Sequence, residues 1–214
     1  MRNNFDQQLQ LLNSEMRDMG ALCEDAIALA SKALSENSKE LAARVPPIAS
    51  ALDQKERDVE NICLKLLLRQ QPVAGDLRQI SAALKMITDM ERIGDQAEDI
   101  AEIITYLSDR SAANEQLMRE MANAAIKMVT DSVDAYVKHD TIMAEKVIAA
   151  DDVVDAYFDR VKHQLIERIA ADPTDGEYAL DLLMIAKYFE RIADHAVNIA
   201  EWVIFSVTGV HKED

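Results

Sequence analysis

An internal repeat constrains the fold of this chain more than any other feature. The segment "ERIGDQAEDIAE", from Glu91 to Glu102, returns almost unchanged as "ERIADHAVNIAE", from Glu190 to Glu201. The same offset of 99 residues aligns Asp53 with Asp152 in the segment that precedes each copy. A constant offset across two separate segments predicts two structural units in tandem, related by duplication.

Each unit is predicted to consist of three helices, because apolar residues recur with a period near 3.6 along most of the chain. A capping box of Asp76 and Gln79 is expected to start the third helix, and Thr174 with Glu177 to start the last. The expected helices cover residues 5–37, 45–69, 76–108, 113–139, 141–170 and 174–207. The sequence therefore predicts an all-α protein with two tandem three-helix repeats, residues 1–110 and 111–214, that form an elongated six-helix bundle.

The composition agrees with a helical bundle, since 49% of the residues are hydrophobic but only 5% are aromatic, with 5 Gly and 4 Pro. The net charge of -16 argues against binding to nucleic acid and to anionic lipid. An acidic surface suits the binding of cations or of a basic partner. The alternative is that the negative charge only keeps the protein soluble.

Neither a membrane span nor a redox site is expected. No apolar run reaches the roughly 18 residues that a spanning helix needs, and the N-terminal segment has no apolar leader region. Cys23 and Cys63 lie at core positions of helices without a CxxC spacing, which predicts buried thiols in a reducing cytoplasm.

Carboxylates form a stripe along the third helix of each repeat. Glu91, Asp95, Glu98 and Glu102 follow the spacing i, i+4, i+7 and i+11, beside a seam of small residues that includes Gly94. The second copy keeps Glu190, Asp194 and Glu201 but has Val197 as the third member. Small residues in the seam would allow the neighbouring helix to approach closely.

The second helix of each repeat carries matching carboxylates, so two facing pairs would build an all-oxygen box between helices. Hard oxygen ligands suit magnesium, manganese or iron, and less readily zinc. The expected metal ligands are Glu56, Glu60, Glu91 and Asp95 in the first repeat and Asp155, Asp159, Glu190 and Asp194 in the second. Asp53, Asp152, Glu98 and Asp131 are candidates for additional ligands.

Alternative interpretations remain for several of these residues. A solvated acidic helix face would show the same spacing, and Asp131 could be locally hydrogen-bonded instead. His195 follows Asp194 and is expected at the surface or facing a partner, because the first copy has Gln96 there. No nucleophilic triad, phosphate loop or HExxH motif is present, so no enzyme activity is expected; the alternative function is a carboxylate-bridged metal enzyme acting on phosphate esters or oxidants.

The two E-x-x-x-D helices, with "RQQPVAGDLR" at Arg69 to Arg78 before the first, resemble the PhoU family over nearly the whole chain. The resemblance implies a cytoplasmic negative regulator of phosphate uptake and of the phosphate-starvation response. It implies action at the inner face of the membrane through the transporter ATPase subunit PstB and the sensor histidine kinase PhoR, commonly as a homodimer. It also implies multinuclear clusters of iron or other metals, held by the four carboxylate pairs already named.

The second repeat departs from the first at three positions of the third helix. Ala193 replaces Gly94, Val197 replaces Glu98, and Asn198 replaces Asp99. The second site is therefore less acidic, and equal metal occupancy of the two sites is not expected.

Overall fold

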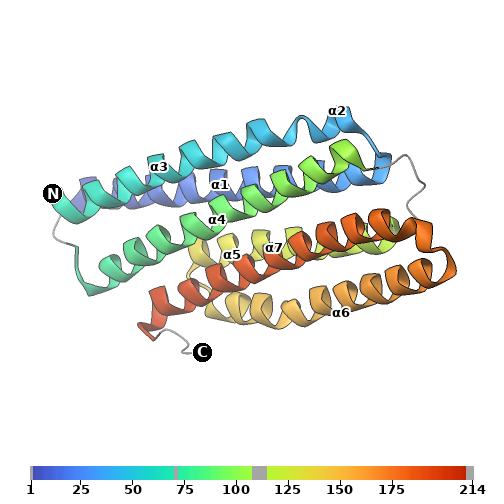
Figure 1. The fold of residues 1–214 in the computed structure, drawn as a ribbon. Coiled ribbons are helices and arrows are strands. Elements are labelled where there is room, and N and C mark those ends of the chain that lie inside the picture. The colour runs from blue at the N-terminus through green and yellow to red at the C-terminus, as the bar shows by residue number, and fades with distance from the viewer. Residues whose placement is uncertain (1, 70–71, 108–114, 211–214) are drawn as a thin grey trace.

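The protein is built from helices throughout residues 2–69, 72–107 and 115–210, which are the residues that the computed structural model describes (Figure 1). The long helices are α1 (Arg2–Glu36), α3 (Val45–Arg69), α4 (Ala74–Tyr106), α5 (Glu115–Lys138), α6 (Thr141–Ala171) and α7 (Gly176–Thr208). A single turn, α2 (Lys39–Ala42), and a 3₁₀ turn, η1 (Pro173–Asp175), complete the described elements. The all-α prediction is confirmed.

The six long helices form two three-helix bundles that lie side by side (Figure 1). Helices α1, α3 and α4 pack together in the first repeat, and α5, α6 and α7 in the second. Contacts of α4 with α7 and of α1 with α5 join the two repeats. Consecutive long helices run in opposite directions, which gives the predicted elongated bundle.

The core runs through the apolar seams of α4 and α7, which are the helices at the centre of the molecule. Met90 and Ile93 on α4, and Phe189 and Ile192 on α7, are fully buried. Tyr136 of α5 is also fully buried, and its hydroxyl donates a hydrogen bond of 3.2 Å to the carbonyl oxygen of Gln79 on α4. The two repeats therefore share one continuous core.

Both cysteines are free and buried, as predicted. The Cys23 thiol donates to the carbonyl oxygen of Met90, 3.4 Å away, and burial raises its pKa well above the ordinary range. Burial also raises the pKa of the Cys63 thiol, to about 12. Neither thiol is poised for chemistry, because the reactive thiolate is strongly disfavoured.

The predicted capping boxes are wrong, although the helices that they introduce are present. Helix α4 begins at Ala74, with Val73 as an extended N-cap that has no side-chain cap, so Asp76 lies within the first turn. A carboxylate there complements the positive end of the helix dipole without capping it. The predicted end of this helix at Ser108 and the start of the next at Ala113 lie outside the described residues.

The start of α7 differs from the expectation for a related reason. Pro173 begins a 3₁₀ turn that is capped by the Asp172 carboxylate, which accepts hydrogen bonds from the Thr174 amide at 3.0 Å and hydroxyl at 2.8 Å. Helix α7 then begins at Gly176. No helix among the described residues is long and apolar enough to cross a membrane.

Candidate metal site

Helices α3 and α4 approach each other closely at Gly94. A Cβ placed on Gly94 would lie 2.6 Å from Leu52 Cδ1 and 3.7 Å from Ala49 Cα. Only the absence of a side chain at position 94 leaves room for Leu52, which is fully buried. The predicted close approach at Gly94 is confirmed.

This approach brings three carboxylates together, because Asp53 follows Leu52 and Asp95 follows Gly94. Asp53, Glu91 and Asp95 each offer a carboxylate oxygen, and these three oxygens lie within 4.8 Å of one another. Asp53 and Glu91 are half-buried while Asp95 is exposed, so one side of this group opens to solvent. We call Asp53, Glu91 and Asp95 the first-repeat cluster.

The electrostatics of the first-repeat cluster favour protonation or a bound cation. Burial raises the pKa of Glu91 above its ordinary value, and the neighbouring carboxylates, first that of Asp95, raise it further. Although Asp95 is exposed as a residue, partial desolvation of its carboxylate raises its pKa, with the charge of Asp53 as the next cause. Arg92 opposes both shifts but does not overcome them.

The other predicted ligands of the first repeat lie around this cluster. Glu56 accepts a hydrogen bond of 3.3 Å from the Thr88 hydroxyl, and its charge contributes to the raised pKa of Glu91. Glu98 is half-buried, and its pKa is raised by burial and then by Asp95. Glu60 is exposed and lies outside the group of three. Asp53, expected only as an additional ligand, thus supplies the oxygen from α3.

In the second repeat, the prominent carboxylate is that of Asp151, which is not among the predicted ligands. Its Oδ1 atom is buried and has no hydrogen-bond partner among the described residues. Burial raises the pKa of Asp151 to about 6, with the charges of Asp155, Asp194 and Glu190 as the next causes. A carboxyl group in this position is costly unless it is protonated or bound to a cation.

The repeat offset contains the signal that would have identified Asp151. An offset of 99 residues aligns it with Leu52, the fully buried residue that fills the space beside Gly94. A carboxylate at a core position of one repeat, matched by leucine in the other, is a candidate for a special role.

The predicted ligands of the second repeat divide into two groups. Burial raises the pKa of Asp194, and the charge of Glu190 is the next cause, so these two carboxylates lie close to each other. Glu190 also forms an ion pair with Lys187, one turn earlier on α7. No second group of three mutually close carboxylates is found in the part of the chain that the structure describes.

The remaining carboxylates of α6 face solvent. Asp152, Asp155 and Asp159 are exposed, although the charge of Asp155 contributes to the raised pKa of Asp151. Asp159 accepts a hydrogen bond of 2.9 Å from Lys162, which lowers its pKa. The structure therefore does not bring Asp159 together with Glu190 and Asp194 in a group of ligands.

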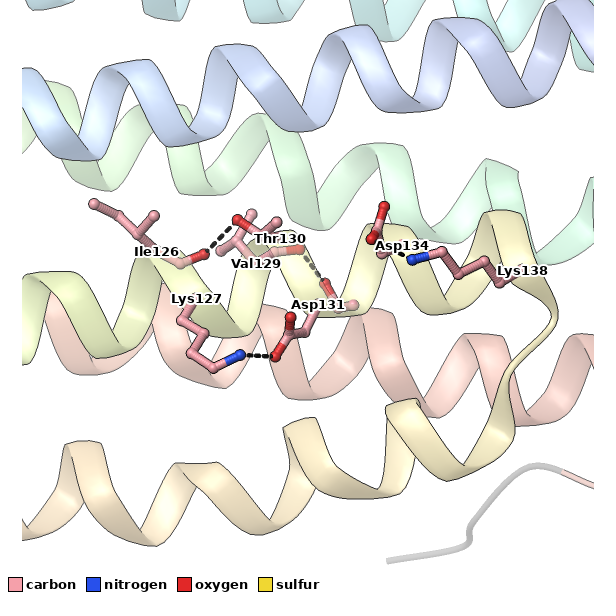
Figure 2. A network of polar contacts seen from close by, with 8 residues as sticks. Ile126, Lys127, Val129, Thr130, Asp131, Asp134 and Lys138 are labelled. Carbon is pink, nitrogen blue, oxygen red and sulfur yellow. Dashed lines mark hydrogen bonds and ion pairs between the residues drawn. The ribbon is translucent and has the colours of Figure 1, made fainter.

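Asp131 is held by its own helix. Its carboxylate accepts a hydrogen bond of 2.5 Å from Lys127, one turn earlier on α5, as Figure 2 shows. Of the two interpretations of Asp131, an additional metal ligand or a locally hydrogen-bonded residue, the structure shows the local hydrogen bond.

His195 occupies a different place from the one expected. Its side chain is only 14% exposed, and its Nδ1 atom lies 2.9 Å from Asp89 Oδ1 on α4. The Asn198 amide donates to the same Asp89 oxygen at 3.2 Å. His195 was expected at the surface or facing a partner, but it faces the contact between α4 and α7 of the same chain, which the helical period of one repeat does not reveal.

The donor chemistry of both repeats fits a hard cation. The first-repeat cluster offers only carboxylate oxygens, the ligands preferred by magnesium, manganese and ferric or ferrous iron. In the second repeat, the unpartnered buried oxygen of Asp151 supplies the same kind of donor.

Comparison with known proteins identifies the family. The family model described as the PhoU domain matches the chain twice, over residues 16–104 and 118–203. The chain belongs to the PhoU family. The resemblance inferred from the two E-x-x-x-D helices is thus confirmed, and each PhoU domain match contains one of them.

Full-length PhoU relatives support this assignment. The phosphate-specific transport system accessory protein PhoU homolog of Clostridium acetobutylicum is 33% identical over 212 residues, which cover 97% of this chain and 96% of the relative. The homolog of the same name from Pseudomonas aeruginosa is 32% identical over 207 residues, covering 96% of this chain and 86% of the relative.

Solved PhoU structures share the fold. The crystal structure of PhoU from Pseudomonas aeruginosa matches with a TM-score of 0.90 and 33% identity, covering 96% of this chain and 100% of that one. The phosphate transport system regulatory protein PhoU from Streptococcus pneumoniae matches with a TM-score of 0.90 and 26% identity, covering 98% and 99%. The six-helix bundle of two repeats is therefore the PhoU fold.

Proposed function

We propose that this PhoU protein is a negative regulator of phosphate uptake and of the phosphate-starvation response. Its relatives are named as accessory and regulatory proteins of phosphate-specific transport, which supports this role. We place it in the cytoplasm, at the inner face of the membrane through its partners. Those partners are the transporter ATPase subunit PstB and the sensor histidine kinase PhoR.

Within this role, the protein acts as a metal-binding adaptor that works by docking and not by turnover. The observation that carries the metal proposal is the first-repeat cluster, where Asp53, Glu91 and Asp95 place three oxygens within 4.8 Å of one another. A bound cation supplies positive charge there, and this offsets the mutual repulsion that raises the pKa of Glu91. Asp53 from α3 and the other two from α4 would then hold the two helices in one register.

The second repeat is expected to bind metal more weakly. Its candidate donors are Asp151 and the three carboxylates whose charges act most strongly on it, which are Asp155, Asp194 and Glu190. The Lys187 ammonium pairs with Glu190 and competes with a cation for it. Two sites of unequal affinity follow, and both fit iron, manganese, magnesium or zinc, alone or in multinuclear clusters.

The adaptor proposal is tested by affinity capture. Purified protein, metal-loaded or treated with chelator, is offered to the transporter ATPase subunit and to the cytoplasmic part of the kinase. We expect capture of both, with at least severalfold less capture after chelation and for Glu91→Gln/Asp95→Asn. The matched control is Asp134→Asn on α5. This substitution removes a carboxylate that pairs with Lys138 and belongs to neither candidate metal site. Capture of neither partner by the metal-loaded protein would contradict the proposal.

The protein is further proposed to work as a homodimer. Sedimentation equilibrium at micromolar concentration checks this, with a mass near twice the 23.9 kDa of one chain as the expected result. A mass of one chain at all concentrations would refute it.

A further inference from the structure

A groove lies between α1 and α5, on a part of the molecule that the carboxylate sites do not use. Its volume is about 420 Å³, and it lies between the last turns of α1 and the first turns of α5. Ser31, Lys32 and Ser35 line it from α1, and Arg119 and Asn123 from α5. The volume of the groove is in the range of small-molecule sites. Its lining residues come from both repeats, from α1 in the first and from α5 in the second.

The lining of the groove is rich in hydrogen-bond donors. Among its described lining residues are an ammonium, a guanidinium, two hydroxyls and an amide, with one carboxylate, that of Glu36, and two apolar side chains, those of Ala28 and Ile126. In a chain with a net charge of -16, a groove with two cations and one anion is locally unusual. This donor set matches a small oxyanion, because arginine and lysine donate charge-assisted hydrogen bonds to phosphate oxygens.

The two cations of the groove are weakly engaged within the protein. Lys32 lies 3.9 Å from Glu36, and both side chains are more than half exposed, so this ion pair is weak. Arg119 has no ion pair with any residue that the structure describes. Two other α5 cations differ, because Lys127 and Lys138 are held by Asp131 and Asp134 one turn away (Figure 2). Ligand binding in the groove therefore breaks no strong internal contact.

We propose that the α1/α5 groove binds the phosphate group of a small ligand, either free inorganic phosphate or a small phosphorylated molecule. Arg119 and Lys32 supply the charge, and Ser31, Ser35 and Asn123 supply neutral donors for the remaining oxygens. The ligand contacts both repeats at once, through α1 and α5. This inference does not rest on metal binding at the carboxylate sites, which are formed by α3 with α4 and by α6 with α7.

Isothermal titration calorimetry tests the proposal on the full-length chain, treated with chelator so that no metal can hold phosphate elsewhere. The titrants are inorganic phosphate, AMP and, as a probe without a phosphate group, adenosine. We expect saturable binding of at least one phosphate-bearing probe and none of adenosine. Tighter binding of AMP identifies a phosphorylated molecule as the ligand, and binding of phosphate at least as tight as AMP identifies free phosphate. Raising the ionic strength is expected to weaken the binding.

Three substitutions locate the site. Arg119→Met is expected to weaken binding about tenfold or more, since it removes the charge-assisted hydrogen bonds but keeps an unbranched side-chain stem. Lys138→Met removes one positive charge from the same helix outside the groove and is expected to leave the affinity within about twofold. Glu36→Gln removes the one carboxylate among the described lining residues and is expected to tighten binding severalfold.

The gain of affinity in Glu36→Gln cannot come from misfolding, so it keeps the test decisive if Arg119→Met unfolds. Circular dichroism checks the helix content of each variant. Two results would overturn the proposal: no saturable binding of phosphate or AMP, or equal affinity in Arg119→Met and in the unaltered protein.

Discussion

One pair of facing positions gives the two repeats different chemistry at the scale of single residues. In the first repeat, the Leu52 side chain fills the space that Gly94 leaves open. At the matching positions of the second repeat, Asp151 stands in place of the leucine and Ala193 in place of the glycine. The second repeat therefore has a half-buried carboxylate, with a buried Oδ1 atom, where the first repeat has a leucine.

Gly94→Ala is expected to destabilise the protein by about 1 kcal/mol. The new methyl group would lie 2.6 Å from Leu52 Cδ1, so Leu52 must shift within a packed core, and this cost exceeds the helix-propensity gain of alanine. The matched control is Gly75→Ala on the same helix, where no atom lies within 4 Å of the new Cβ and a gain of up to about 1 kcal/mol is expected. Urea unfolding of the metal-free proteins measures both. An increase in stability for Gly94→Ala as large as for Gly75→Ala would contradict the close approach.

Asp151→Asn is expected to stabilise the metal-free protein at pH 7.5 by about 1–2 kcal/mol, less than the roughly 3 kcal/mol of the full pKa shift, because solvent screens a half-buried carboxylate. The folded pKa of Asp151, about 6, lies above its ordinary value of 3.8, so the folded state holds this proton more tightly than the unfolded state. The resulting stability is fully present below about pH 4 and is lost as the pH rises through about 6. The asparagine side chain is neutral at every pH, so the gain grows between about pH 4 and pH 6 and is complete above that window.

Urea unfolding at several pH values, in the presence of chelator, measures the effect of Asp151→Asn. Asp159→Asn is the control, because Asp159 is exposed, paired with Lys162 and has a lowered pKa. It should show no such gain. A gain for Asp151→Asn that is the same at pH 4 and pH 7.5 would show that burial of a charge is not the cause.

At the scale of helices, α4 and α7 are joined by polar contacts as well as by their apolar seams. Asp89 of α4 accepts hydrogen bonds from His195 and Asn198 of α7. The offset of 99 residues relates Asp89 to Tyr188 and Asn198 to Asp99, and the Tyr188 hydroxyl interacts with the Asp99 carboxylate and opposes the rise of its pKa. The interface between the repeats therefore contains two polar contacts, Asp89 with His195 and Asn198, and Asp99 with Tyr188, at positions related by the duplication.

Asp89→Ala is expected to lower the free energy of unfolding by about 1–3 kcal/mol, since it leaves two polar side chains of α7 without their acceptor. Thermal unfolding followed by circular dichroism measures the loss. The control is Asp134→Ala, which breaks an exposed pair with Lys138 and should cost less than about 0.5 kcal/mol. Equal losses in the two variants would mean that Asp89 contributes no more than a surface carboxylate.

The existence of these helices could be predicted from the sequence, but their starts and mutual contacts could not. The period of the apolar residues predicted the six long helices, because a helix that buries one face places apolar residues along that face at regular spacing. The starts of α4 and α7 were misplaced because Val73 and the 3₁₀ turn after Asp172 replace the expected capping boxes. The Asp89–His195 contact joins residues 106 positions apart, and nothing local to either helix predicts it.

At the scale of the whole molecule, the duplication both revealed the candidate site and hid part of it. The shared offset singled out Glu91 and Asp95, and the small side chain of Gly94 correctly indicated a close approach. Which α3 carboxylate meets them depends on the relative rotation of two helices, and the structure brings Asp53 and not Glu60 into the group. Asp151 was not predicted as a ligand because the expected metal ligands were chosen as carboxylates present in both repeats, and the residue that matches Asp151 in the first repeat is Leu52.

Metal binding is expected to stabilise the whole bundle. At a manganese concentration about 100 times the dissociation constant, one site adds about 2.7 kcal/mol, which raises the melting temperature by roughly 5–10 °C for a chain of this size. Differential scanning calorimetry with and without manganese measures the shift, at constant ionic strength. An equal shift in a variant with Asp53→Asn, Glu91→Gln and Asp95→Asn would show that the stabilisation arises elsewhere.

The central claim is that the first-repeat cluster binds a cation, and a direct count of bound metal tests it. The protein is loaded with manganese, freed of excess by gel filtration, and its metal content is measured by inductively coupled plasma mass spectrometry. The account predicts at least one manganese per chain in the unaltered protein and in the control Asp134→Asn, and a loss of about one in Glu91→Gln/Asp95→Asn. The same manganese content in all three proteins, or none in any of them, would contradict it.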